Sequence, residues 1–285
     1  MLPADHHVHS EWSWDAAGGS MEECCRRADA IGLPALAFTE HADFTPWLRP
    51  EDDALAPPGV RTPVSPGGRG DLDIEGYWRC LERCRSLFPH LRLISGVELG
   101  EPHRFPAQTE LVLGTHPLER ILGSVHCIPD QGALVDLSTR GFLGSGGAQV
   151  ERARTYFAEV LALVESAPVF AVLAHLTYPQ RYWPPEGPAW SVELFEEEIR
   201  TVLGSAADAG LALESNTTRG MSEDRGMCPQ PAVFRWWKEA GGRAVSLGSD
   251  AHAADAVAGG FHRAAAMLED AGFRRPLEPT GFWLL

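Results

Sequence analysis

The sequence lacks several features that would assign it to a membrane or a nucleic acid. No apolar run approaches the length of about 18 residues that a membrane-spanning helix needs, and the N-terminus has neither the basic start nor the apolar stretch of a signal peptide. Basic residues are outnumbered, 24 against 39 acidic ones, which gives a net charge of −15. Because such a surface repels phosphate backbones and anionic lipids, we expect a soluble, cytoplasmic protein with no nucleic-acid or membrane partner.

Two common sequence signatures are also missing. The six cysteines form no Cys-x-x-Cys pair, so neither a zinc knuckle nor a thioredoxin-type site is indicated, and in a reducing compartment they are expected to be small buried hydrophobic residues. No Gly-x-Gly-x-x-Gly follows the first expected strand, so a dinucleotide-binding fold has no support.

What the chain does contain is enough apolar material for a large core. Of its 285 residues, 44% are hydrophobic, and no repeat, low-complexity tract or linker divides them. We therefore expect a single domain over residues 1–285. A loop rich in proline and glycine, at about 46–70, is too polar and too broken to pack. It is expected to be an insertion, although a lid over a site is an alternative.

Short apolar strands alternate with helices along the whole chain. Ser20 followed by Glu23 is a capping box that predicts a helix start, and Gly32 predicts its end. After a first strand around residues 5–9, strands are expected at 36–39, 91–97, 121–125, 169–174, 211–214 and 244–248, with a short closing segment at 281–285. Further helices are expected at about 72–88, 105–113, 149–166, 190–209, 231–240 and 254–271. The alternation predicts parallel strands covered by helices, in either an open doubly wound sheet or a closed barrel.

The first expected strand contains the first candidate metal ligands, in the segment Asp5-His6-His7-Val8-His9-Ser10. Side chains two apart on a strand share a face, so His7 and His9 can grip one cation together. A single His-x-His motif is weak evidence for a metal site, because two ordinary polar residues near a terminus can give the same pattern.

Every expected strand except the sixth and the short closing segment has a candidate metal ligand, an imidazole or a carboxylate, at its carboxyl end, where barrels of this type place their active residues. With Asp15 in the first loop, nine candidates result: His7, His9, Asp15, His41, Glu98, His126, His175, Asp250 and His252. Crowded together without a cation, such groups would be desolvated and would repel one another. Because nine exceed the three or four ligands of one tetrahedral site, we expect more than one metal, with a carboxylate bridging two.

These segments resemble the polymerase-and-histidinol-phosphatase (PHP) family over about residues 4–273. The resemblance is carried by Asp5–Ser10, Thr39-Glu40-His41, Gly96-Val97-Glu98, Gly123–His126, Ala174-His175 and Gly248–His252. It implies a distorted (β/α)7 barrel, similar to a TIM barrel, with a trinuclear metal centre at the carboxyl ends of the strands. By motif position, one metal would be held by His7, His9, Glu98 and Asp250, a second by Glu98, His126 and His175, and a third by Asp15, His41 and His252.

Two further features resemble the histidinol-phosphatase branch of that family. Asp15 stands where other members have histidine, and Glu214–Arg219 is similar to the branch's Glu-x-Asn-Thr-x-x-Arg segment. One departure is that Leu176-Thr177 follows His175, where branch members often carry aspartate two residues beyond the histidine. The resemblance thus implies hydrolysis of L-histidinol phosphate, a step of histidine biosynthesis, with a different residue at this position of the substrate site.

The expected reaction is attack of a metal-bound hydroxide on phosphorus, with two or three zinc, manganese or iron ions. Arg219 and Arg181 are the candidates for phosphate binding, because a guanidinium fork matches two phosphate oxygens. No general acid is assigned, and nothing in the sequence indicates an oligomeric state. Alternatives are another small substrate such as a nucleotide or sugar phosphate, a non-catalytic metal-binding module, and a nuclease, which the acidic charge disfavours.

Overall fold

The structure, a computed structural model, describes the chain except for residues 1, 17, 46–71, 145–146 and 218–226. The strands are β1 (Asp5–Val8), β2 (Ala35–Asp43), β3 (Arg92–Gly100), β4 (Arg120–Ser124), β5 (Cys127–Asp130), β6 (Ala133–Asp136), β7 (Val172–Leu173), β8 (Ala212–Asn216), β9 (Ala244–Gly248) and β10 (Trp283–Leu284). The α-helices are α1 (Met21–Ala30), α3 (Ile74–Leu87), α4 (Pro106–Leu113), α5 (Ala148–Glu165), α6 (Glu196–Asp208), α7 (Pro231–Glu239) and α8 (Phe261–Asp270).

Eight strands form one curled sheet in the order β1-β2-β3-β4-β7-β8-β9-β10. All neighbours are parallel except β9 and β10. The sheet curls until β1 meets the end of β9, where Asp250 donates its backbone N–H to the carbonyl of His7 (2.8 Å) and His9 donates to that of Ala251 (2.8 Å). The predicted distorted barrel of seven parallel strands is therefore confirmed, and the open doubly wound alternative is not.

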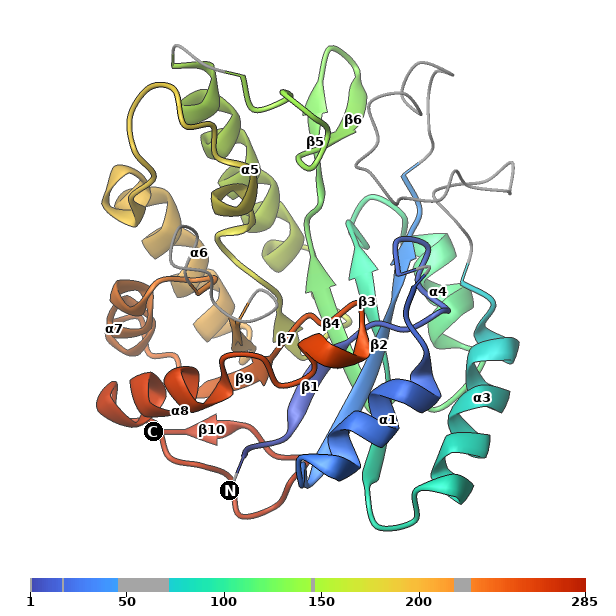
Figure 1. The fold of residues 1–285 in the computed structure, drawn as a ribbon. Helices are drawn as coiled ribbons and strands as arrows, with labels where there is room; N and C mark the ends of the chain where they lie inside the picture. Colours follow the sequence, from blue (N-terminus) through green and yellow to red (C-terminus); the bar gives the residue numbers. More distant parts are fainter. Residues whose placement is uncertain (1, 17, 46–71, 145–146, 218–226) are drawn as a thin grey trace.

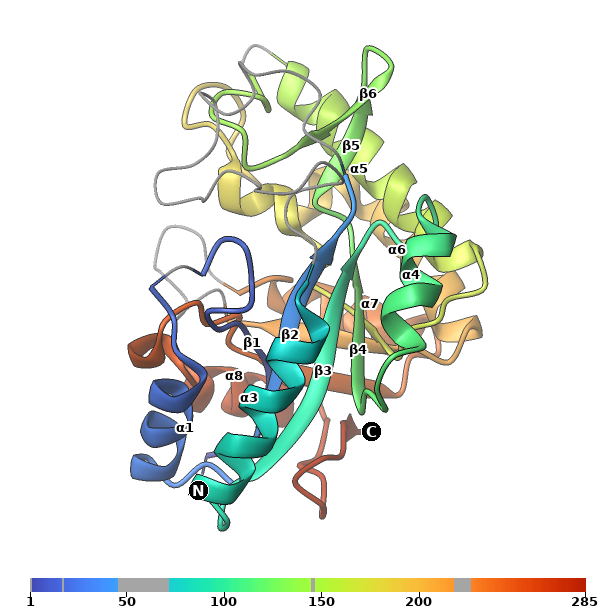
Figure 2. The ribbon, with the colours of Figure 1, turned by 90° about the vertical axis from the view of Figure 1, so that its right-hand side faces the viewer.

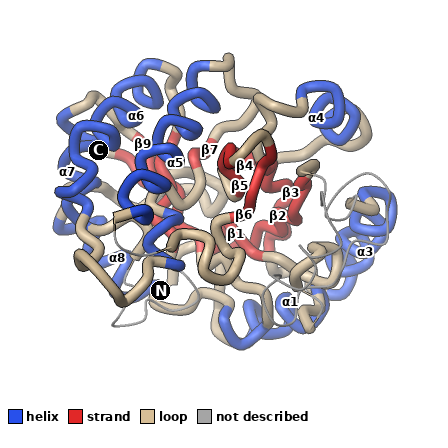
Figure 3. The backbone as a smooth tube through the Cα atoms, turned by 90° about the horizontal axis from the view of Figure 1, so that it is seen from above, coloured by secondary structure: helices blue, strands red, loops and turns tan. Residues whose placement is uncertain are grey.

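Helices surround the strands on the outside, as the view from above shows (Figure 3). Their apolar faces are buried against the sheet, for example Tyr156, Phe157 and Val160 of α5 and Trp237 of α7. Ser20 caps α1 by accepting the backbone N–H of Glu23, as the capping box predicts. Among the described helices, none combines the length and the apolarity that crossing a membrane requires.

The strand that begins at residue 35 is longer than expected. β2 continues to Asp43, because each residue from Ala35 to Asp43 pairs in parallel register with β3. Its last four residues include three ionisable ones that are buried, so hydrophobicity alone could not reveal them. The fifth expected strand, in contrast, is only two residues long, since β7 pairs with its neighbours only at Val172 and Leu173.

An antiparallel hairpin, β5–β6, was not expected from the sequence. Its two-residue turn is Gln131-Gly132, and both residues have positive φ, as the tight turns of hairpins require. The hairpin projects beyond the carboxyl ends of the strands (Figures 1 and 2).

Two expected helices have different starts in the structure. The helix expected at 190–209 begins as a 3₁₀ turn, Val192–Phe195, before α6. The one expected at 254–271 is interrupted by Gly259 and Gly260, so that a short 3₁₀ turn, Ala254–Ala256, precedes α8. The proline- and glycine-rich loop at 46–70 lies outside the described residues, and the single domain with this insertion stays a prediction.

Candidate metal centre

The nine candidate residues all lie at the carboxyl end of the barrel. His7 belongs to β1, His41 to β2 and Glu98 to β3, while the others follow the strands directly or lie in the first loop: His9, Asp15, His126, His175, Asp250 and His252. His41 and Glu98 are register partners on neighbouring strands, which places them side by side. The parallel topology thus brings together residues that are up to 245 positions apart, from His7 to His252.

Glu98 lies at the centre of this group and is fully buried. Its Oε2 atom is 3.3 Å from Nε2 of His7, 3.4 Å from Nε2 of His9 and 3.1 Å from Nδ1 of His41. Its Oε1 atom faces the opposite side, 2.6 Å from Nε2 of His175 and 3.4 Å from Nε2 of His126. One carboxylate therefore contacts two separate sets of imidazoles.

Asp250 and Asp15 are the other two carboxylates of the cluster, and both contact its histidines. Oδ1 of Asp250 lies 3.4 Å from Nε2 of His9 and 3.6 Å from Nδ1 of His252. Asp15 bonds on one side to Nε2 of His252 (2.9 Å) and lies 3.4 Å from Nε2 of His41 on the other. The structure therefore brings all nine candidates into one connected cluster.

Three triplets within the cluster have ligand atoms that lie within 4.8 Å of one another. They are His7, His9 and Glu98; His41, Glu98 and His126; and His9, His41 and His252. Within the described residues, two buried ligand-type atoms of the cluster, Nδ1 of His41 and Oδ1 of Asp15, lie near charged neighbours but form no hydrogen bond of good geometry. Nitrogen and oxygen donors in this arrangement fit divalent transition metals.

Two of the nine residues have an uncommon backbone conformation. His175 has φ of 23° and Asp250 has φ of 54°, a region that non-glycine residues rarely adopt. Both follow a barrel strand directly or nearly so, and their side chains turn toward Glu98 and His9. Strain of this kind is retained where the surrounding structure fixes it, commonly at functional sites.

The charges in the cluster depend strongly on one another. Burial would raise the pKa of Glu98, but His7, His126, His175 and His41 hold it well below the usual range. Burial would lower the pKa of His7, but Glu214, Glu98 and Asp250 raise it well above the ordinary value. Burial and the neighbouring histidines instead lower the pKa of His9, so positive charge is stabilised at His7 and disfavoured at His9.

Of the two arginines predicted to bind phosphate, one lies in the part of the chain that the structure describes. Arg181 lies in the 3₁₀ turn Tyr178–Tyr182 after β7, and its guanidinium forms an ion pair with Asp250 and lies over the ring of Tyr178. It therefore contacts the cluster directly. Arg219 lies outside the described residues.

Sequence reasoning missed the supporting role of Glu214 and Asp43. Glu214 contacts Nδ1 of His7, and Asp43 contacts Nδ1 of His126. Glu214 belongs to a segment that the sequence singles out, on the one strand without a candidate ligand. Asp43 lies beyond the strand expected at 36–39, because the polar end of β2 has no hydrophobic pattern that would reveal it.

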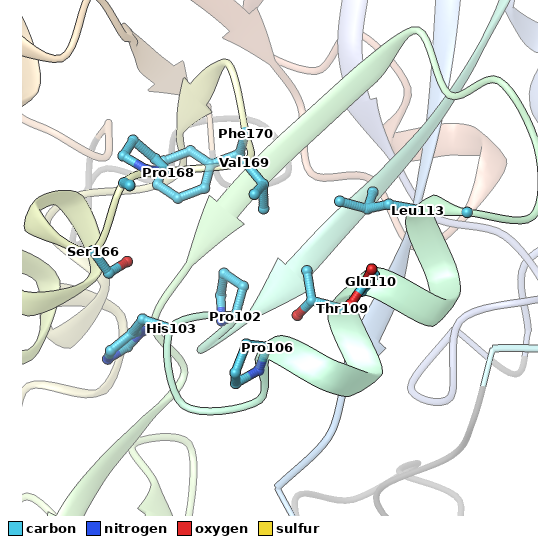
Figure 4. Close-up of a pocket in the computed structure, with 12 residues that line it drawn as sticks. Pro102, His103, Pro106, Thr109, Glu110, Leu113, Ser166, Pro168, Val169 and Phe170 are labelled. Atoms are coloured by element: carbon cyan, nitrogen blue, oxygen red, sulfur yellow. The ribbon is translucent and has the colours of Figure 1, made fainter.

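A separate cleft of about 520 Å³ lies away from the nine residues, between α4 and residues 166–170 (Figure 4). His103 lines it and pairs through Nε2 with Glu159 of α5 at 2.6 Å.

The comparisons with known proteins agree with this geometry. The model of the PHP domain matches residues 5–218. The chain belongs to the PHP domain family. This PHP protein is 26% identical over 278 residues to the histidinol-phosphatase of Lactococcus lactis, covering 96% of this chain and 93% of that one. It is 24% identical to a probable histidinol-phosphatase of Clostridium acetobutylicum, covering 95% and 94%.

Solved structures confirm the PHP fold. The histidinol phosphate phosphatase of Lactococcus lactis, solved as a complex with zinc, L-histidinol and phosphate, superposes with a TM-score of 0.79 at 22% identity, covering 99% of this chain and 98% of that one. A putative histidinol phosphatase from Listeria monocytogenes gives a TM-score of 0.70 at 18% identity, covering 91% and 99%.

Proposed function

We propose that this PHP protein is a metal-dependent phosphoric monoester hydrolase whose substrate is L-histidinol phosphate. The observation that carries the proposal is the cluster of nine imidazoles and carboxylates around the two oxygens of Glu98. Relatives named histidinol-phosphatase, which match nearly the whole chain, support the choice of substrate.

The metals are assigned as the sequence motifs imply. His7, His9, Glu98 and Asp250 would hold the first, Glu98, His126 and His175 the second, and Asp15, His41 and His252 the third. The position of Glu98 supports its role as the bridge, because Oε2 faces His7 and His9 while Oε1 faces His126 and His175. The nitrogen and oxygen donor set is compatible with zinc, manganese or iron.

When bound, these metals would supply positive charge for the phosphate oxygens and make a water acidic enough to act as a nucleophile near neutral pH. The role of the protein is to hold the metal-ligating side chains rigidly in a buried site at the carboxyl end of the barrel, so that little reorganisation is needed during the reaction. Arg181 adds a guanidinium whose flat fork can bind two phosphate oxygens, and Arg219 is the second candidate for that role.

The test is a metal analysis combined with a substrate panel. Protein purified without chelator should carry two or three transition-metal ions per chain and should hydrolyse L-histidinol phosphate far faster than nucleotide or sugar monophosphates. Exhaustive chelation should abolish the activity, and adding zinc, manganese or iron should restore it. Full activity after chelation would overturn the metal mechanism, and a preference for another phosphate would overturn the substrate.

A further inference from the structure

The carboxylate of Glu214 is buried in the wall of the metal centre. It lies on β8, with only 1% of its side chain exposed. Its Oε1 is 2.6 Å from Nδ1 of His7, and its Oε2 accepts the backbone N–H of His175 (2.7 Å) and the side-chain amide of Asn216 (3.1 Å). Glu214 therefore links β8 to His7 of β1 and to His175, which follows β7.

The contact with Glu214 fixes which nitrogen of His7 faces the centre. Nδ1 points to Glu214, so Nε2 points inward, 3.3 Å from Oε2 of Glu98 and 3.0 Å from Nε2 of His9. An imidazole that donates its Nδ1 proton to a carboxylate keeps a lone pair on Nε2, which is the form that binds a metal.

Asp43 has the same relationship with His126 on the other side of Glu98. Its Oδ1 lies 3.1 Å from Nδ1 of His126, while Nε2 of that histidine lies 3.4 Å from Oε1 of Glu98. Trp14 holds Asp43 in turn, by donating its indole N–H to Oδ2 at 2.8 Å. Two histidines assigned to different metals are therefore oriented in the same way.

A glycine makes room for each of these carboxylates. A Cβ atom at Gly248 would lie 2.6 Å from Oε1 of Glu214 and 2.4 Å from Cβ of His7. A Cβ atom at Gly100, the register partner of Asp43, would lie 2.0 Å from its Oδ1. Neither glycine has positive φ, so the need is for space and not for an unusual backbone.

We propose that Glu214 and Asp43 are positioning residues, which hold His7 and His126 with Nε2 turned toward Glu98 ready to bind metal. Gly100 is required because a side chain there would displace Asp43, and Gly248 because one would displace both Glu214 and His7. The inference rests on the proposed metal-dependent function and extends it to residues outside the ligand set. Neither carboxylate is a catalytic residue, since each acts through a histidine.

The experiment measures the affinity for Zn²⁺ by competition with a chromophoric chelator. Glu214→Gln and Asp43→Asn should each weaken binding by about 10- to 100-fold, the usual effect of losing a partner that orients a ligand. Gly100→Ala should weaken it as well, because a Cβ atom there would lie 2.0 Å from Oδ1 of Asp43, although every ligand and both carboxylates remain.

Glu159→Gln is the matched control. Glu159 is also a buried carboxylate paired with an imidazole, that of His103 at 2.6 Å, but it contacts none of the nine residues of the cluster. This variant should bind Zn²⁺ as the parent does, which separates orientation of a ligand from general loss of stability. Thermal unfolding of each metal-free variant shows which of them fold, and Asp43→Asn and Gly100→Ala test the inference if Glu214→Gln does not fold.

The outcomes separate this inference from the proposed function. If the parent binds Zn²⁺ and hydrolyses the substrate while the folded variants bind Zn²⁺ with parental affinity, the positioning role is overturned and the proposed function stands. If the parent itself binds no metal, the proposed function fails and this inference fails with it.

Discussion

The Nη2 atom of Arg181 lies 2.6 Å from Oδ2 of Asp250, at the edge of the cluster of nine residues. Both side chains are largely buried, with 12% and 4% exposed. Burial would lower the pKa of this arginine, but the carboxylate keeps it charged. A positive charge is thus held beside a proposed metal ligand, next to the place where the phosphate of the proposed substrate would bind.

The first prediction concerns this arginine. Arg181→Ala should lower kcat/KM for L-histidinol phosphate by about 100-fold, the scale of losing one preorganised charged contact in the transition state. Arg181→Lys should recover only part of the loss, because a point charge replaces a fork. Steady-state kinetics provide the measurement, with Arg275→Ala as the control, since Arg275 pairs with Glu269 on the surface. Parental efficiency in Arg181→Ala would shift the phosphate contact to Arg219.

The second prediction concerns the bridge. Glu98→Gln should reduce activity more than Asp15→Asn does, because a neutral amide between two cations removes charge from both. Among the described residues, Asp15 forms its ion-pair contacts with the two histidines assigned to the third metal, His252 and His41. Metal content per chain and kcat are measured on both variants. Equal and mild losses in the two would contradict the assignment of Glu98.

The third prediction concerns stability in acid. Burial would raise the pKa of Glu159, but Arg104 and His103 lower it to about 2. Because this is below the ordinary value of 4.5, the ionised carboxylate stabilises the fold above about pH 4.5, and that contribution is lost as the pH falls toward 2. Glu159→Gln should therefore cost about 2 kcal/mol at pH 7 and progressively less below pH 4.5.

Urea denaturation of this variant and of the parent across that pH range is the measurement. Glu151→Gln serves as the control, because Glu151 is exposed on the same helix, α5. A difference between Glu159→Gln and the parent that stays constant down to pH 2 would argue against the assigned contacts.

The fourth prediction compares two glycines. A Cβ atom at Gly123 of β4 would lie 2.5 Å from the buried ring of Phe170, so Gly123→Ala should destabilise the protein by about 1–3 kcal/mol. Gly204 lies inside α6 with no neighbour within 4 Å, so Gly204→Ala should stabilise it by up to about 1 kcal/mol. The free energy of unfolding is measured for both. The same sign in both variants would be inconsistent with this packing.

The sequence was informative about residues at the ends of buried strands. Parallel strands carry their carboxyl ends to one edge, so His41, Glu98 and His126 could be predicted to converge from their place in the chain alone. The barrel class followed from the same alternation of strands and helices. Both conclusions depend on local patterns, which a single sequence displays.

Contacts between distant residues that share no pattern could not be predicted. Glu214 and His7 are 207 positions apart, and Asp43 and His126 are 83 apart. Which carboxylate meets which imidazole depends on the curl of the sheet and on the space beside Gly248 and Gly100. The polar end of β2 was missed for a related reason: its pairing with β3, and not its hydrophobicity, keeps it extended.

The closure of the barrel between Val8 and Ala251 also bears on how the protein is made. A ribosome releases the first strand long before the last one, yet Asp250 and His252 reach the cluster only when β9 has docked against β1. Contacts of such long sequence separation are slow to form. The nine side chains therefore come together late, after nearly the whole chain has been synthesised, and a shortened translation product that ends before residue 250 cannot assemble them.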